Sequence, residues 1–324
     1  MNRFITLLMV LVLLASGACQ RKDLLDPHDH YNLIINASFD EHALNQLISN
    51  KSDGYSKPGE PKTTKYVLFE KTTKKVADEG WFNGLTGGLY VEEEGVYDLL
   101  LYTSDFYEYD ANFYRGLDNA INAETYTRQS PLAEVTPRTD VKEMYMVEPD
   151  PTFSVLYKDI VVLNGQENQL IDVELVQKSF KYYLTIKAKG LQNIHTAKMH
   201  ISGMYTTAYL THEEHRINEA GIQNVDMAIT RYDHNDILGE GEIYGEFWSF
   251  GPNVREDISN SITLYFINGD VITMKLQDLS PQIKTLTRGG EIIVTEKLEI
   301  KGPASGFQPG VGDWNDPTDV EIIL

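Results

Sequence analysis

The chain has 324 residues, and its 48 acidic and 28 basic side chains give a formal net charge of −20. A field of this sign repels nucleic acid and anionic membrane surfaces, so neither is expected as a direct partner. The length allows two domains of ordinary size, and the single cysteine excludes an intramolecular disulfide.

The first 18 residues have the layout of a secretory signal peptide. Arg3 precedes an uncharged apolar run over residues 4–15, which is too short to span a bilayer, and small residues occupy positions 16–18. Cys19 comes next, as in bacterial lipoprotein signals, although Ser16 stands where those signals usually have leucine. We expect Cys19 to carry the lipid, such as palmitate, and to become the mature N-terminus. An ordinary signal peptide with an incidental cysteine is the alternative.

A short polar tether is expected over residues 19–30, followed by a first domain over residues 31–148. Leu33, Ile35 and Ala37 alternate with other residues, which is the period of a half-buried strand. The elements predicted for this domain are strands at 31–40, 66–70, 88–92 and 95–103, a loop at 50–62 and an irregular segment at 104–130.

A domain boundary is predicted at residues 148–151, E-P-D-P, because paired prolines stiffen a chain and end sheets. The second domain is expected over residues 149–324. Asn268-Gly269-Asp270 is a hairpin signal between two of its strands. Its predicted elements are strands at 169–176, 180–188, 196–202, 241–250, 261–267, 271–276 and 292–300, with possible helices at 212–223 and 278–286.

Many short strands without alternating long helices indicate an all-β fold of antiparallel β-sandwiches rather than a parallel α/β sheet. No later stretch is apolar over 18 residues, so no helix is expected to span a membrane after removal of residues 1–18.

Several stretches together resemble one family. They are C-Q-R-K-D-L at 19–24, E-G-V-Y-D-L-L-L-Y at 94–102, V-E-L-V-Q-K-S-F-K-Y-Y-L-T-I at 173–186, A-K-M-H-I-S-G-M-Y at 197–205 and G-V-G-D-W-N-D-P-T-D-V-E-I-I-L at 310–324. In these the chain resembles the bacteroidete fimbrillin-associated lipoproteins, which include minor-fimbrium anchor proteins and uncharacterised fimbrillin-like relatives.

This resemblance implies two transthyretin-like β-sandwich domains in tandem behind a lipid anchor in the outer membrane. It implies a role as anchor or accessory subunit of a fimbria-like fibre, with fimbrial or other surface proteins as partners. It implies no catalysis and no cofactor. A surface glycan-binding lipoprotein is the alternative function.

Most clusters of chemically active residues have a simpler structural explanation. His212 and His215 are three apart, whereas the zinc protease motif places its histidines four apart on one helix face. Gly239 and Gly241 lack the third glycine of a dinucleotide loop. No metal site is therefore predicted. His28-Asp29-His30 lies in the tether, where a rigid site is not expected, and whether the turn with Asp313, Asn315, Asp316 and Asp319 binds a cation stays open. The acidic run Glu92-Glu93-Glu94 offers carboxylate pairs, but their presence does not identify a glycosidase dyad without geometry.

Aromatic residues gather among acidic ones at 106–114, with Phe106, Tyr107, Tyr109, Phe113 and Tyr114. Such a group can stack on a sugar or contact a protein, but filling the core beneath an irregular loop is favoured.

The last residues, 320–324, alternate with Val320, Ile322 and Leu324 on one face, which predicts a strand with an apolar side. This strand either closes the second sandwich of its own chain or is donated to a neighbouring subunit. We expect the first placement, because an anchor at the end of a fibre needs to accept a strand but not to give one.

Overall fold

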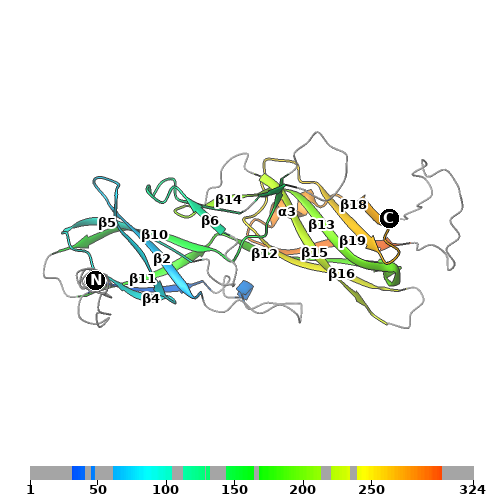
Figure 1. Ribbon diagram of the computed structural model, residues 1–324, viewed down its shortest axis with the longest axis horizontal. Helices are drawn as coiled ribbons and strands as arrows, with labels where there is room; N and C mark the ends of the chain where they lie inside the picture. The colour runs from blue at the N-terminus through cyan, green and yellow to red at the C-terminus, as the bar shows by residue number, and fades with distance from the viewer. Residues whose placement is uncertain are drawn as a thin grey trace, which may run out of the picture.

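The computed structural model describes residues 31–40, 45–47, 61–103, 112–127, 129–131, 144–163, 168–212, 220–233 and 239–300. In this part of the chain nearly all regular structure is β, as predicted, and it forms two large sheets and one small sheet (Figure 1). No helix among these residues is long and apolar enough to cross a membrane.

The first sheet has seven strands and lies on the left of Figure 1. In spatial order they are β3 (Val76–Asn83), β2 (Thr63–Glu70), β5 (Gly95–Thr103), β10 (Phe153–Val162), β11 (Gln169–Gln177), β1 (Leu33–Phe39) and β4 (Thr86–Leu89).

The second sheet lies beside the first along the long axis of the molecule (Figure 1). Its main path is β18 (Val271–Lys275), β17 (Asn260–Phe266), β13 (Ile194–Tyr205), β15 (Ala220–Arg231), β16 (Gly241–Ser249), β12 (Phe180–Lys189) and β19 (Gly290–Glu299). Two short strands, β8 (Gln129–Pro131) and β9 (Met144–Met146), extend it through pairing of β9 with β15. The third sheet holds β14 (Thr207–Tyr209), β7 (Glu124–Thr127) and β6 (Asn112–Arg115).

The sheets are mixed rather than purely antiparallel, which corrects the expectation from the sequence. β1 runs parallel to β11, and β12 runs parallel to β19. Parallel neighbours need long connections, whereas antiparallel neighbours can be joined by short turns. These two pairs join strands that lie more than 100 residues apart in the chain, and β9 also runs parallel to β15, so long connections are available.

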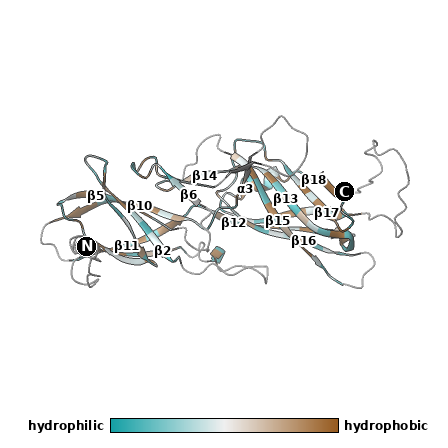
Figure 2. Cartoon of the chain, in the orientation of Figure 1, coloured by the Kyte–Doolittle hydropathy of each residue, from teal (hydrophilic) through white to brown (hydrophobic). Residues whose placement is uncertain are grey.

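The burial of β5 on both of its faces explains why its sequence is a continuous apolar run. Leu99 and Leu101 face one hydrophobic cluster, while Leu100 and Tyr102 face another on the opposite side of the sheet. All four are almost fully buried, because other elements cover both faces of this central strand. Strands of the second sheet instead alternate between hydrophobic and hydrophilic residues along their length (Figure 2).

Several predicted elements agree closely with the structure. β5 has the predicted bounds, and residues 268–270 form the turn between β17 and β18. Gly269 adopts a φ of +93° there, and Asn268 Oδ1 accepts a hydrogen bond of 3.0 Å from the N–H of Asp270. Helix α3 (Ser280–Thr285) falls within the predicted helix at 278–286 and has proline in its first turn, where the missing N–H costs nothing.

Two other predictions are wrong. Residues 220–223 begin β15 rather than ending a helix, because Gln223, Val225 and Met227 are buried with period two against β13. The segment predicted as irregular at 104–130 contains the paired strands β6 and β7.

The sheets divide the chain differently from the boundary predicted at residues 148–151. β10 and β11 follow that segment but return to the first sheet, where they pair with β5 and β1. The chain enters the second sheet for its longer course only at β12, after residue 179. The division into two independently folding domains, 31–148 and 149–324, remains untested, and sheet membership favours a later division.

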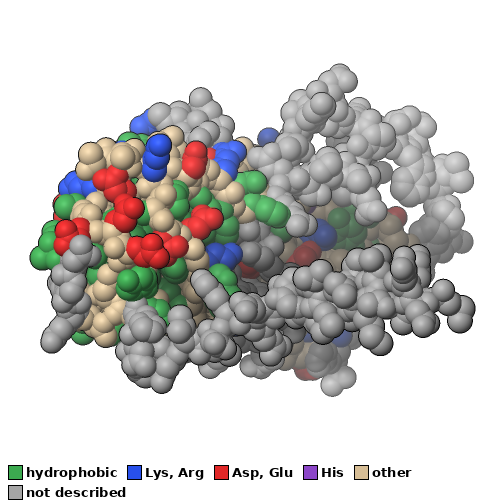
Figure 3. All heavy atoms as spheres, turned by 60° about the vertical axis from the view of Figure 1, so that its left-hand side comes forward, with side chains coloured by type: hydrophobic (Ala, Val, Ile, Leu, Met, Phe, Trp, Pro, Cys, Tyr) green, Lys and Arg blue, Asp and Glu red, His purple; other side chains and the backbone are tan. Residues whose placement is uncertain are grey.

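Acidic and apolar side chains share the outer surface of the first sheet. On the face turned forward in Figure 3, Asp and Glu side chains lie among hydrophobic ones. This mixture matters for ligand binding, because apolar contact and hydrogen-bond acceptors are offered together.

Candidate functional site

The two large sheets meet at a junction formed by two crossings of the chain. Residues 147–152 lead from β9 to β10, and residues 178–179 lead from β11 to β12. The crossings bond to each other. The N–H of Lys178 donates to the carbonyl of Thr152 at 2.7 Å, and the Ser179 hydroxyl accepts from the N–H of Thr152 at 2.8 Å and donates to the carbonyl of Asp150 at 2.9 Å. Thr152 and Ser179 are fully buried, so water does not compete for these bonds.

Gln46 ties three further segments together at the junction. Its Oε1 accepts hydrogen bonds from Nε2 of Gln177 at 2.7 Å and from the N–H of Lys181 at 3.0 Å. Its Nε2 donates to the carbonyl of Arg288 at 2.9 Å. A single buried amide therefore links both sheets, and its loss leaves buried polar groups without their partner.

Trp248 belongs to β16 of the second sheet but packs into the core of the first. Its side chain is buried, and its backbone N–H donates to Oε1 of Glu148 at 2.7 Å. Desolvation raises the pKa of the Glu148 carboxyl to about 8, although the Trp248 N–H and the nearby Lys181 ammonium favour the ionised form. Glu246 and Asp150 raise this pKa further through their negative charge.

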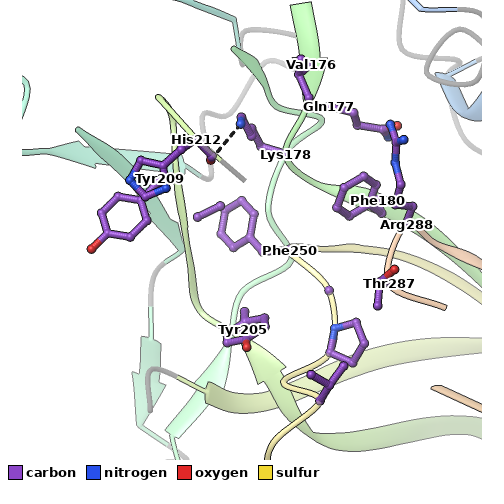
Figure 4. A pocket seen from close by; sticks show the side chains of 14 residues that line it. Val176, Gln177, Lys178, Phe180, Tyr205, Tyr209, His212, Phe250, Thr287 and Arg288 are labelled. Atoms are coloured by element: carbon purple, nitrogen blue, oxygen red, sulfur yellow. Dashed lines mark hydrogen bonds between the residues drawn. The ribbon is translucent and has the colours of Figure 1, made fainter. Parts of the chain in front are cut away.

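A pocket of about 330 Å³ opens at this junction (Figure 4). Four aromatic side chains line it: Phe180, Phe250, Tyr205 and Tyr209. The full lining is Val176, Gln177, Lys178, Phe180, Tyr205, Ala208, Tyr209, His212, Phe250, Gly251, Pro252, Val254, Thr287 and Arg288.

The charged side chains of the pocket, Lys178 and Arg288, are basic. The ammonium of Lys178 donates to the carbonyl of His212 at 3.1 Å, which brings together residues that the sequence separates (Figure 4). Arg288 lies 6.0 Å from the ring centre of Phe180 and within 3.6 Å of a carboxylate oxygen of Asp40. None of the 14 lining residues is Asp or Glu, which is unusual in a chain of net charge −20. The pocket can therefore hold an apolar group that carries a negative charge.

Of three comparisons with known proteins, the one with solved structures finds similar proteins. No protein-family model matches the chain, and no curated protein matches it. Among solved structures, a putative adhesin from Bacteroides ovatus is similar with a TM-score of 0.55 and 14% sequence identity, over 89% of this chain and 98% of that protein. The chain has the fold of that Bacteroides protein.

Two more distant structures carry related descriptions. A putative adhesin from Bacteroides thetaiotaomicron has 11% identity over 86% of this chain and 92% of that one, with a TM-score of 0.46. The fimbrial anchor protein Mfa2 from Porphyromonas gingivalis has 10% identity over 82% and 88% of the two chains, with a TM-score of 0.43. The fimbrillin-like resemblance is supported at the level of the fold by the B. ovatus protein.

The histidine pair weighed as a metal site is only partly described. His212 lies in the junction pocket, where its ring is 4.1 Å from the ring of Tyr209. His215 lies outside the described residues. The described part of the chain holds no group of three His, Cys, Asp or Glu side chains that could bind a metal ion.

Other candidate residues fall into ordinary structure. Gly241 opens strand β16 rather than a helix, so the glycine pair is no dinucleotide loop. Tyr114 packs against Tyr102 with ring centres 4.8 Å apart and joins the core on that side of β5, as favoured from the sequence. Phe113 lies 5.5 Å from Tyr126.

Several candidates lie outside the described residues. They are Cys19, His28-Asp29-His30, Phe106, Tyr107, Tyr109, the turn with Asp313, Asn315, Asp316 and Asp319, and the C-terminal strand at 320–324. Lipidation of Cys19, cation binding by the turn and the placement of the last strand stay predictions.

Sequence reasoning missed the residues that build the junction. Gln46 gives no signal, because its partners lie more than 130 residues further along the chain. Trp248 does leave one: residues 247–250 are Phe-Trp-Ser-Phe, a break in the alternation of β16, and all four are buried. Such a break indicates that both faces of the strand end are covered.

Proposed function

We propose that this chain is a lipid-anchored cell-surface protein that serves as an anchor or accessory subunit of a fimbria-like fibre, in adhesion or fibre assembly. The observation that carries the proposal is a fold shared with a putative adhesin of Bacteroides ovatus over 89% of this chain and 98% of that protein. Fold alone does not determine function, so the N-terminal signal is the second support.

The anchor part of the proposal rests on residues 1–19. A signal of this layout followed by Cys19 suits export and attachment of acyl chains, and the tether at 19–30 then connects the outer membrane to β1. Several acyl chains hold a protein firmly, whereas one holds it only marginally. In this role the last strand, 320–324, stays in the second of two transthyretin-like sandwiches of its own chain. Its partners are fimbrial or other surface subunits, and no catalysis is involved.

The junction suits a subunit that bears load. A fibre anchor transmits pulling force from its partner to the membrane, through every connection between its sheets. Here the sheets are connected by two bonded chain crossings, by the Gln46 amide and by the Trp248 side chain, and the residues Thr152, Ser179, Gln46 and Trp248 that make these connections are buried. Buried hydrogen bonds of this kind open only when the structure around them opens.

The test of the anchor is a single substitution, Cys19→Ala, made in the producing cells. With the native chain, a labelled fatty acid should be incorporated and the protein should sediment with outer membranes. With Cys19→Ala, the label should be lost and the processed protein should move to soluble fractions. A matched Ser16→Ala variant should keep both properties. A mature native N-terminus that carries no lipid on Cys19 would refute the proposal.

A further inference from the structure

A cleft of about 750 Å³ opens where the first sheet fails to close on itself. β3 and β4 are the two edges of this sheet, and the chain joins them directly through a turn at residues 84–85. Gly84 takes a φ of +68° in this turn, which glycine tolerates without strain. Among the described strands, β3 pairs only with β2 and β4 only with β1, so these two edges do not pair with each other.

The wall on the β4 side is held in place by side chains. The Asn32 side chain accepts a hydrogen bond from the N–H of Val91 at 2.9 Å and donates to its carbonyl at 2.8 Å. The Tyr97 hydroxyl donates to the carbonyl of Glu93 at 2.8 Å. Residues 90–93 are therefore positioned before any ligand arrives, which lowers the entropic cost of binding.

Aromatic rings line the cleft from both walls. Trp81 comes from β3 and Tyr90 follows β4, and they are 64% and 56% exposed. Tyr31 and Tyr66 lie deeper, with their rings against Gly88 and Gly80. A Cβ atom at Gly88 would come within 2.3 Å of the Tyr31 ring. The deeper rings thus pack on glycine backbone, while the two outer residues are mostly exposed to solvent.

The charged groups of the cleft are all acidic. Asp78, Glu92 and Glu93 line it, and among the described residues no Lys, Arg or His contributes to its lining. The Tyr66 hydroxyl donates to Oδ2 of Asp78 at 2.9 Å, and burial together with this bond raises the pKa of Tyr66 above its ordinary value. An ionised carboxylate offers about four lone-pair sites, so Asp78 can accept further hydrogen bonds.

We infer that this cleft binds a neutral oligosaccharide, with Trp81 and Tyr90 stacking on sugar rings and Asp78, Glu92 and Glu93 accepting hydrogen bonds from sugar hydroxyls. A pyranose ring has an apolar face of C–H groups and a rim of hydroxyl donors, which matches aromatic faces beside carboxylates. A sugar acid would meet three carboxylates with no lining cation to pair with it, in a chain that is already strongly negative. The size of the cleft lies within the range of about 300–1,000 Å³ typical of small-ligand sites.

A cationic ligand is the competing chemistry, because aromatic rings and carboxylates also attract ammonium groups. A cage for one ammonium surrounds it closely with several rings. Here the two exposed rings belong to different walls of a cleft that is much larger than one ammonium group. This arrangement suits a ligand with successive flat faces, as linked sugars have.

The test uses the full chain purified in detergent and a panel of immobilised ligands. The panel holds neutral oligosaccharides of glucose, galactose, mannose, xylose and N-acetylglucosamine, with uronate-containing and sialylated sugars and a Lys/Arg-rich peptide. We expect at least one neutral sugar to be retained and the acidic sugars to be rejected, most strongly at low salt. Trp81→Ala and Tyr90→Ala should each weaken the dissociation constant for the retained sugar about tenfold.

Tyr232→Ala is the matched control, because Tyr232 is 62% exposed but lies away from the cleft in sequence and sheet. It should leave sugar binding unchanged. Thermal unfolding should be alike in all three variants, since each replaced ring is exposed. Three results would overturn the inference: failure of the native chain to retain any neutral sugar, retention by Trp81→Ala and Tyr90→Ala equal to that of the native chain, or binding of the basic peptide alone. None of these results bears on the fibre role, which rests on different residues.

Discussion

Replacing Trp248 with alanine should destabilise the first sheet, although the residue belongs to the second. The indole lies in the cluster that contains Leu33, Ile35 and Phe153 of the first sheet, and only 3% of Trp248 is exposed. Trp248→Ala therefore removes a ring from a core to which its own sheet contributes little else.

The size of the effect follows from the buried area. A buried tryptophan removes roughly 150–250 Å² from water, and at about 25 cal/mol per Å² this amounts to about 4–6 kcal/mol. Alanine keeps part of that area, so the free energy of unfolding should fall by about 3–5 kcal/mol. A domain is stable by about 5–15 kcal/mol, so the loss is a large fraction of the total.

Urea unfolding of the chain without residues 1–19, followed by circular dichroism, measures this loss. Trp81→Ala is the matched control, since it removes the same side chain from a position that is 64% exposed. Its unfolding free energy should change by less than about 0.5 kcal/mol. Equal stability of the two variants would show that Trp248 does not pack into the first core and would refute the reasoning.

Three further predictions concern the junction and the end of the chain. The pKa of Glu148 is about 8 in the fold against an ordinary value of 4.5, so the native state binds this proton more tightly than the unfolded state. The stability that this proton contributes is complete below pH 4.5 and is lost as the pH rises toward 8. Glu148→Gln should therefore gain stability relative to the native chain as the pH rises from 5 to 8.5, measured by urea titrations. A difference in unfolding free energy between the two chains that stays constant with pH would contradict this. Gln46→Ala should cost about 1–3 kcal/mol in the same assay, because buried partners including the Lys181 N–H lose their hydrogen bonds, and an unchanged midpoint would count against the network. Deleting residues 320–324 should lower the melting temperature if that strand closes its own sandwich, whereas intact stability with lost fibre assembly would identify a donated strand.

Local patterns in the sequence predicted the strands whose burial shows directly in the order of their apolar and polar residues. β5 was predicted with its observed bounds, because Gly95 begins an apolar run that is buried on both faces. β15 was missed although Val225, Met227 and Ile229 alternate with other residues, because its inward face begins with the polar Gln223. In that strand the pairing with β13, against which Gln223 is buried, decides the structure.

The junction and the cleft depend on contacts between residues that are far apart in the sequence or on different strands, and local sequence patterns do not predict such contacts. Gln46 meets Lys181 and Arg288 only because two chain crossings bring their segments together. Trp81 and Tyr90 face one cleft because the turn at residues 84–85 carries the chain from one sheet edge to the other. Neither juxtaposition follows from periodicity, which reports the face of a strand but not its neighbour.

The fibre role is tested most directly by counting fibres on cells and in the medium after the gene is removed. If the protein anchors the fibre, fibres should be lost from the cell surface and appear in the medium, and the native chain should restore attachment while Cys19→Ala should not. Fibres that remain attached in equal number without this protein would contradict the anchor role.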